Sequence, residues 1–177
     1  MVVVFDYVGL NDGNLEAAIE TSRANFQREG VATNWSVCHR AEGRREKCTL
    51  PAEGSFVTIN LVPQMKSALA GIAASNFLGW SIRDSVADGR PIAYVFHRPV
   101  TASAAKAGQP LRVALAWAMV HEVSHLLGLN HAPSGVMRAS PQTRDLLDVA
   151  RGLGFAPCQG KQLHSGASRL YARATLP

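Results

Sequence analysis

The amino-acid sequence predicts a layered domain of the α/β or α+β class. Short β-branched and aromatic runs recur through the first half of the chain, a helical pattern follows the first of them, and a long apolar helical segment precedes residue 131. The chain has 177 residues, which is the size of one domain. We therefore expect residues 1–177 to form a single domain.

The first strand and the first helix are the clearest local patterns. Val2–Tyr7 is β-branched and aromatic, as buried strands are. Asn11 and Asp12 then offer N-cap oxygens, and Gly30 stands where a helix would end. Between them, apolar and small residues recur every three or four positions, as on one face of a helix: Leu15, Ala18, Ile19, Ser22 and Phe26.

Four more short strands are expected in the first half of the chain. They are Ala32–Cys38, Ser55–Val62, Asn76–Ile82 and Pro91–Phe96. Gly79 weakens the third of these assignments, because glycine has no side chain to pack in a strand. The charged stretch Arg40–Glu53 is expected to be a loop.

Helices dominate the predicted second half. Thr101–Gln109 is expected to be a linker of small residues before a long helix at Pro110–Leu127. Ser140 is the expected N-cap of a last helix, Gln142–Gly152. Residues 155–177 show no clear periodicity.

Composition excludes some classes of function. The chain has 18 basic and 13 acidic residues, a net charge of +5, but no dense basic block with aromatics, so we expect no nucleic-acid partner. No apolar run approaches the ~20 residues that span a bilayer, so we expect no membrane partner. The N-terminus lacks the basic region of a signal peptide. We expect a monomer, secreted or periplasmic if a leader was removed.

The three cysteines leave two interpretations open. Cys38 and Cys48 are ten positions apart and could close a loop between two strands. Unpaired thiols at these positions and at Cys158 are the alternative.

Residues 121–131 read HEVSHLLGLNH and carry the chemistry. On a helix, His121 and His125 lie on one face and can bind one metal ion together. Glu122 is one position round the helix from His121, which places its carboxylate beside the metal, where it can act as general base. These residues predict a zinc site with a catalytic glutamate.

A catalytic zinc ion takes three protein ligands and keeps one position open. His131 is the expected third ligand, but a continuing helix would carry it away from the other two. Gly128 lies between the second and third histidines and can adopt a left-handed conformation at no steric cost. We therefore expect the helix to end at Gly128 and the chain to turn back.

HEVSHLLGLNH matches HExxHxxGxxH and so resembles the signature of the metzincin clan of zinc endopeptidases. Met137, six residues after His131, matches the methionine that this clan places in a tight turn beneath its metal, the Met-turn. The resemblance implies an α+β fold: a mixed, twisted sheet of about five strands with an antiparallel edge strand, two long helices packed on it, and a C-terminal helix. The order of elements predicted above agrees with this layout.

The resemblance also implies where substrate would bind. The edge strand would be Asn76–Ile82, so Gly79 and Trp80 are candidate substrate-binding residues, and Arg138, just after Met137, is a candidate for selecting acidic side chains. No cysteine cluster follows His131, which argues against the archaeal two-zinc branch. The chain resembles a small bacterial-type member of the clan.

The predicted function is that of a zinc metalloendopeptidase with one catalytic Zn²⁺ and a peptide or protein substrate. Water activated by the metal would hydrolyse the peptide bond, with Glu122 as general base. Two alternatives are a catalytically inactive module that binds zinc and peptides, and a zinc hydrolase of a non-protein amide.

Overall fold

The structure is a computed structural model that describes residues 1–10, 13–39, 56–65, 77–83 and 90–174. The charged stretch Arg40–Glu53, with Cys48, lies outside the described residues. Five strands form one sheet: β1 (Val2–Asp6), β2 (Trp35–His39), β3 (Val57–Val62), β4 (Gly79–Ile82) and β5 (Ile92–Phe96). Their order across the sheet is β2-β1-β3-β5-β4. All four predicted strands after the first are therefore present, with shifted ends.

The sheet is mixed, and its one antiparallel member is at the edge. β1 pairs in parallel with β2 and β3, and β3 pairs in parallel with β5. β4 runs antiparallel to β5, with Gly79 opposite Val95 and Ile82 opposite Ile92. The expected α+β class, the five-stranded mixed sheet and its antiparallel edge strand are confirmed.

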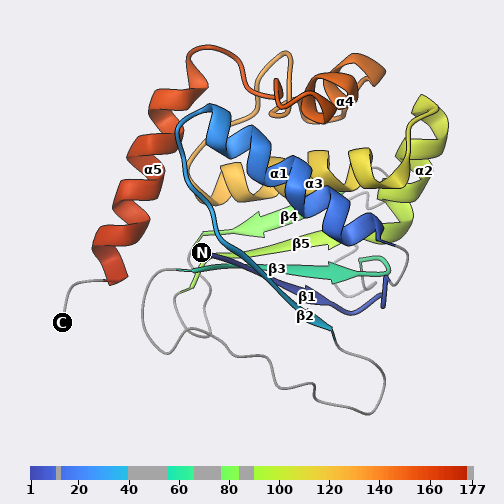
Figure 1. Cartoon of the computed structure of the whole chain (residues 1–177), viewed down its shortest axis with the longest axis horizontal. Coiled ribbons are helices and arrows are strands. Elements are labelled where there is room, and N and C mark those ends of the chain that lie inside the picture. The colour runs from blue at the N-terminus through green and yellow to red at the C-terminus, as the bar shows by residue number, and fades with distance from the viewer. Residues whose placement is uncertain (11–12, 40–55, 66–76, 84–89, 175–177) are drawn as a thin grey trace.

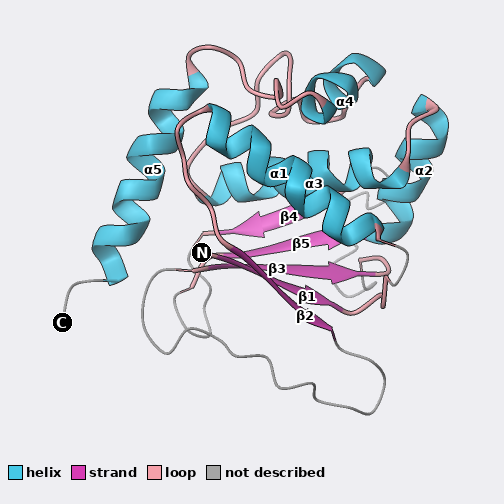
Figure 2. Cartoon of the chain, in the orientation of Figure 1, coloured by secondary structure: helices cyan, strands magenta, loops and turns pink. Residues whose placement is uncertain are grey.

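Two long helices, α1 (Asn14–Arg28) and α3 (Leu111–Leu126), cover one face of the sheet (Figures 1 and 2). The predicted face of α1 is buried from Leu15 to Phe26. Asn11 and Asp12 lie outside the described residues, and the N-cap of α1 is Gly13. The C-terminal glycine prediction is confirmed: Gly30 has a φ of 76°, and the N–H of the next residue donates to Phe26 O at 2.9 Å.

The helix α3 is the centre of the core. Every residue from Val113 to Ser124 is buried, which is typical of a helix that other elements surround. It packs against α1, against α2 (His97–Ala107), against α4 (Thr143–Ala150) and against the strands β3, β4 and β5. The two site residues His121 and Glu122 are therefore held on the most enclosed element of the fold.

The prediction of a linker at Thr101–Gln109 is wrong, because α2 covers most of this stretch. Its alanines are strong helix formers, and Val100 and Ala104 are buried against α3. Pro99 stands in the first turn, where its missing N–H has no partner to lose. The small residues thus serve close helix packing.

The ends of α4 and the C-terminal segment also differ from expectation. The N-cap of α4 is Gln142, which forms a capping box with Asp145, so Ser140 is not the cap. The segment without periodicity contains a further helix, α5 (Gln159–Ala174). Its Gly166 lies so close to the backbone of Leu127 that a Cβ would overlap it. That close approach anchors α5 beside the end of α3.

Cys38 is disulfide-bonded, and Cys158 is a free, exposed thiol. The interpretation with three unpaired thiols is therefore wrong. Within the described residues, none of the helices combines the length and the apolar character that crossing a bilayer requires.

Candidate metal centre

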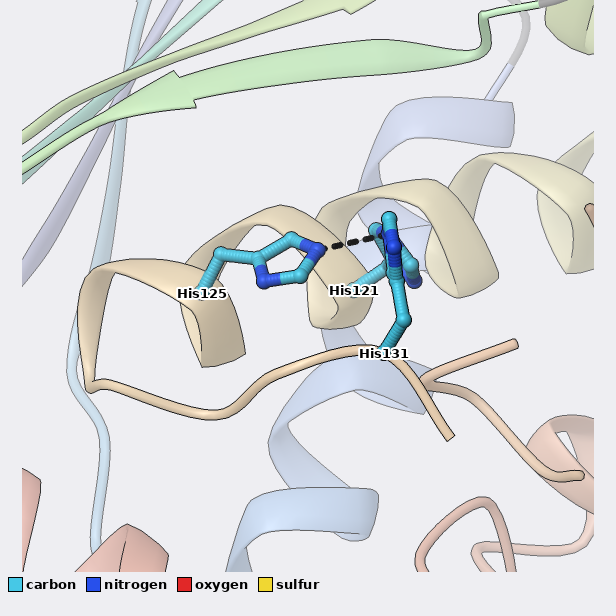
Figure 3. A group of neighbouring side chains, drawn as sticks. All are labelled: His121, His125 and His131. Carbon is cyan, nitrogen blue, oxygen red and sulfur yellow. Dashed lines mark hydrogen bonds between the residues drawn. The ribbon is translucent and has the colours of Figure 1, made fainter. Parts of the chain in front are cut away.

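The end of α3 brings the second and third histidines together as the sequence predicts. Gly128 has a φ of 98° and donates its N–H to His125 O at 3.0 Å, while the N–H of Leu129 donates to Ser124 O at 2.9 Å. These two bonds form a Schellman motif, which ends the helix and reverses the chain. His131 then lies below α3, facing the histidines of the helix (Figure 3).

The three imidazoles form one cluster. One ring nitrogen from each of His121, His125 and His131 lies within 4.8 Å of the corresponding nitrogens of the other two. The cluster is graded in exposure, since His121 is buried, His125 is half-buried and His131 is exposed. A ligand could therefore approach from the side of His131.

Hydrogen bonds fix which nitrogen of each helical histidine faces the cluster. His121 Nδ1 lies 2.7 Å from Val136 O, and His125 Nδ1 lies 2.8 Å from Leu129 O. A carbonyl oxygen only accepts, so Nδ1 carries the proton in both rings. In a neutral imidazole the Nε2 atom then presents a lone pair.

The two Nε2 atoms lie only 3.0 Å apart. Two lone pairs at this distance repel unless a proton or a cation lies between them. Burial lowers the pKa of His121 to about 3 and also lowers the pKa of His125, and both shifts disfavour the proton. Neutral imidazoles whose Nδ1–H is bound to a carbonyl are the usual ligands of zinc, so the donor set fits this ion.

Trp117 supports this cluster from the preceding turn of α3. Its ring stacks on His121 with centroids 4.7 Å apart and an interplanar angle of 24°. Among the described residues, the Trp117 Nε1 atom is buried with no hydrogen-bond partner. Sequence reasoning missed this residue, although its spacing of four positions before His121 could have indicated the contact.

Glu122 is buried beside the cluster. The residue is 4% exposed, and burial raises the pKa of its carboxyl to about 8, against the effect of a side-chain hydrogen bond with Ser81. Gly79 also packs closely against Glu122, because a Cβ on Gly79 would lie 2.6 Å from Glu122 Oε1 and 2.7 Å from Tyr94 O. The carboxylate thus occupies space that only glycine at position 79 leaves open.

One cavity of about 360 Å³ joins these residues. Its lining includes the three histidines, Glu122 and the predicted substrate-binding residues Gly79 and Trp80. Sequence reasoning did not identify the other lining residues that belong to the edge strand or its ends: Phe77, Leu78, Ser81 and Arg83. Ser81 could have been found from strand alternation, since it shares a face with Gly79.

Met137 is fully buried in a turn that contacts the cluster through the backbone. The turn is closed by a bond from Arg138 N to Gly135 O at 3.1 Å, and Gly135 has a φ of 75°. The Val136 carbonyl, inside the turn, accepts a hydrogen bond from His121 Nδ1–H, and the N–H of Ala132, next to His131, donates to Met137 O at 2.8 Å. Backbone groups of this turn therefore bond both to His121 and to the residue that follows His131.

Arg138 lies apart from the cavity that contains the histidines. Its Nε donates to Asp145 Oδ2 at 2.8 Å, and the same carboxylate accepts the N–H groups of Gly135 and Gln142. Asp145 is buried, so this arrangement ties the Met137 turn to the start of α4.

The fold built from this sheet and the central helix is similar to that of two solved structures. It is similar to a zinc-dependent peptidase from Methanocorpusculum labreanum, with 15% identity and a TM-score of 0.58 over 92% of this chain and 100% of that one. It is also similar to archaemetzincin from Methanopyrus kandleri, with 16% identity and a TM-score of 0.56 over 95% of both chains. No family profile and no curated protein sequence matches the chain. At this identity the likeness shows the fold alone, so the expectation of a bacterial-type member stays a prediction.

Proposed function

We propose that the chain is a zinc-dependent endopeptidase of the metzincin type, with HEVSHLLGLNH as its signature and Met137 in a Met-turn. The observation that carries the proposal is the convergence of three imidazoles, two of them oriented by carbonyl groups, in one cavity with a buried glutamate. Likeness of fold to zinc-dependent peptidases supports it.

His121, His125 and His131 would hold one zinc ion. When bound, zinc supplies the Lewis acidity that activates water and polarises a scissile carbonyl. In its ionised form, Glu122 would take a proton from the attacking water and return it to the leaving amine. The hydrogen bond with Ser81 and the close packing against Gly79 would hold that carboxylate in place.

The edge strand β4 is the proposed docking site for an extended peptide. It pairs with β5 on one side, and no strand of the described ranges pairs with its other side. Gly79 and Trp80 both line the cavity, so a peptide added along β4 would pass the histidines. The substrate we propose is therefore a peptide or an unfolded protein segment, bound by a monomer.

Peptide cleavage by the zinc-loaded protein tests this function. A mixed peptide library incubated with the protein should give defined products by mass spectrometry, and a zinc chelator should stop their formation while its non-chelating isomer does not. An inactive zinc- and peptide-binding module would bind the library without products. A zinc hydrolase of non-protein amides would leave the peptides intact but release amine from small amides.

Gly79→Ala is expected to impair turnover without releasing the metal. The new Cβ would overlap Glu122 and the Tyr94 carbonyl, and the carbonyl is backbone, so the carboxylate must be displaced. Misplacement of a catalytic group by about 1 Å costs on the order of 100-fold in rate. We therefore expect kcat to fall about 100-fold while the zinc content stays at one ion per chain, measured by atomic emission. A kcat near that of the wild type would contradict the role of Gly79.

A further inference from the structure

Two exposed arginines meet beside the turn that ends α3. A Cβ on Gly128 would lie 3.9 Å from Nη1 of Arg83 and 3.3 Å from Nη2 of Arg169. Arg83 directly follows the edge strand β4, and Arg169 belongs to the C-terminal helix α5. Two elements far apart in the sequence thus deliver guanidinium groups to one place.

Neither guanidinium has an acidic partner within the part of the chain that the structure describes. The ion pairs there involve Arg23, His39, Arg138 and Arg144. Arg169 Nη1 donates to Ser165 Oγ at 2.6 Å, which leaves the rest of its donors available. Two positive charges this close repel each other, and an anion that accepts hydrogen bonds from both would offset this repulsion with two attractions.

Arg83, one member of the pair, belongs to the lining of the proposed catalytic cavity. Arg83 lines that cavity together with His125 and Glu122. A group bound by Arg83 would therefore belong to a molecule that also passes the histidines.

Two other basic side chains, Arg138 and Lys106, do not offer the same site. Arg138 is occupied by the buried carboxylate of Asp145, so the acid-selecting role expected for Arg138 has a better candidate elsewhere. Lys106 lines a separate cavity between α2 and residues 140–143. Arg83 and Arg169, which have no acidic partner among the described residues, therefore suit an anionic part of the substrate.

Resting on the proposed peptidase function, we propose that Arg83 and Arg169 form a subsite that binds a carboxylate of the peptide substrate. Arg83 Nη1 and Arg169 Nη2 lie 3.9 Å and 3.3 Å from one point, the place where a Cβ on Gly128 would be. The distance between these two nitrogens therefore cannot exceed those two distances added together. A carboxylate that accepts one charge-assisted hydrogen bond of about 2.8 Å on each oxygen can span that gap. Arginine suits this task because its planar group presents several donors to a carboxylate at once.

Cleavage-site profiling followed by matched peptides tests the subsite. A random decapeptide library should show Glu or Asp enriched at one fixed position relative to the cleaved bond. A peptide pair differing only by Glu or Gln at that position should differ about tenfold in kcat/KM for the wild type. In Arg83→Gln and in Arg169→Gln the ratio of kcat/KM between the Glu and the Gln peptide should fall to about one.

Arg112→Gln is the matched control. Arg112 is an exposed arginine at the start of α3, the opposite end of the helix from His125. This variant should retain the full preference for the Glu peptide. Zinc content should be the same in all three variants, because none of the changed side chains is a proposed ligand.

The source of the carboxylate is decided by a second peptide pair, with a free or an amidated C-terminus. A preference for the free C-terminus that both arginine variants abolish would identify the terminal carboxylate as the bound group. A preference for internal Glu alone would identify a side chain. Equal turnover of all charged and uncharged pairs, or a preference that survives both variants, would overturn the subsite.

Failure of the subsite is separable from failure of the proposed function. Zinc-dependent cleavage without acidic preference would remove the subsite and leave the peptidase. If no peptide is cleaved, binding of fluorescein-labelled Glu and Gln decapeptide pools to the zinc-loaded wild type still measures the subsite. About tenfold tighter binding of the Glu pool, lost in Arg83→Gln, would support it, and equal binding would overturn it.

Discussion

Glu122→Gln is expected to lower kcat by a factor of about 100 to 10,000 while zinc stays bound. The amide has nearly the shape of the carboxylate but cannot accept the proton of the attacking water. Glu122 is not among the three residues whose nitrogens converge, so its replacement leaves the ligand set intact. Initial rates on a cleaved peptide, with zinc content measured on the same sample, check this result. Wild-type turnover by the variant would contradict the assignment of the base.

The pH dependence of thermal stability provides a second test of Glu122→Gln, in the metal-free protein. Glu122 has a folded pKa of about 8 against 4.5 for the unfolded chain. Between these values the unfolded state releases a proton that the folded state keeps, so the stability of the metal-free protein falls as pH rises. Glutamine cannot ionise. The Tm of the metal-free variant should therefore exceed that of the metal-free wild type by more at pH 8 than at pH 5.

His131→Ala is expected to weaken zinc binding by more than about 100-fold, since loss of a group that merely orients a ligand already costs about 10- to 100-fold. His131 is exposed, so its removal leaves no buried cavity and the fold should persist. A competition titration with a chromogenic chelator measures the affinity, and circular dichroism verifies the fold. Peptide cleavage should disappear together with the metal.

A matched histidine separates loss of the ligand from loss of any imidazole. His97, at the start of α2, contacts Thr101 and is not part of the histidine cluster. His97→Ala should keep the zinc affinity and the turnover of the wild type. Unchanged zinc affinity in His131→Ala would show that the third ligand lies elsewhere.

Short-range patterns explain how much of this fold the sequence could predict. The face of α1 and the strands β1 and β5 follow from local periodicity, and the histidine turn follows from Gly128, whose role depends on its immediate neighbours. The helix α2 was misread because alanine and serine suit both linkers and tightly packed helices. Its identity depends on what packs against it, and this information is not local.

The helix α5 shows a second limit. Its inward residue Leu163 is fully buried, and Ala167 and Leu170 pack against the core, but these three apolar positions are interspersed with polar residues and glycines. Gly166 reads as a helix breaker in the sequence, yet it is what lets α5 approach Leu127. Closeness between distant segments decides such cases.

The candidate site likewise contains some residues that the sequence could predict and others that it could not. The three histidines and Glu122 could be predicted because one motif contains them all. Ser81 and Trp117 could have been found from strand and helix spacing. The pairing of Arg83 with Arg169 could not, because it depends on where α5 crosses the Gly128 turn.

The segment from Leu129 to Val136 has a consequence for how this centre tolerates change. Its first carbonyl orients His125, its last carbonyl orients His121, and His131 lies between them. One short stretch of backbone therefore determines the aim of all three nitrogens. The exposed side chains of Asn130, Pro133 and Ser134 can vary at little cost, whereas inserting or deleting a single residue would misdirect every nitrogen together. Over evolutionary time, the length of this stretch should be far more constrained than the composition of these exposed positions.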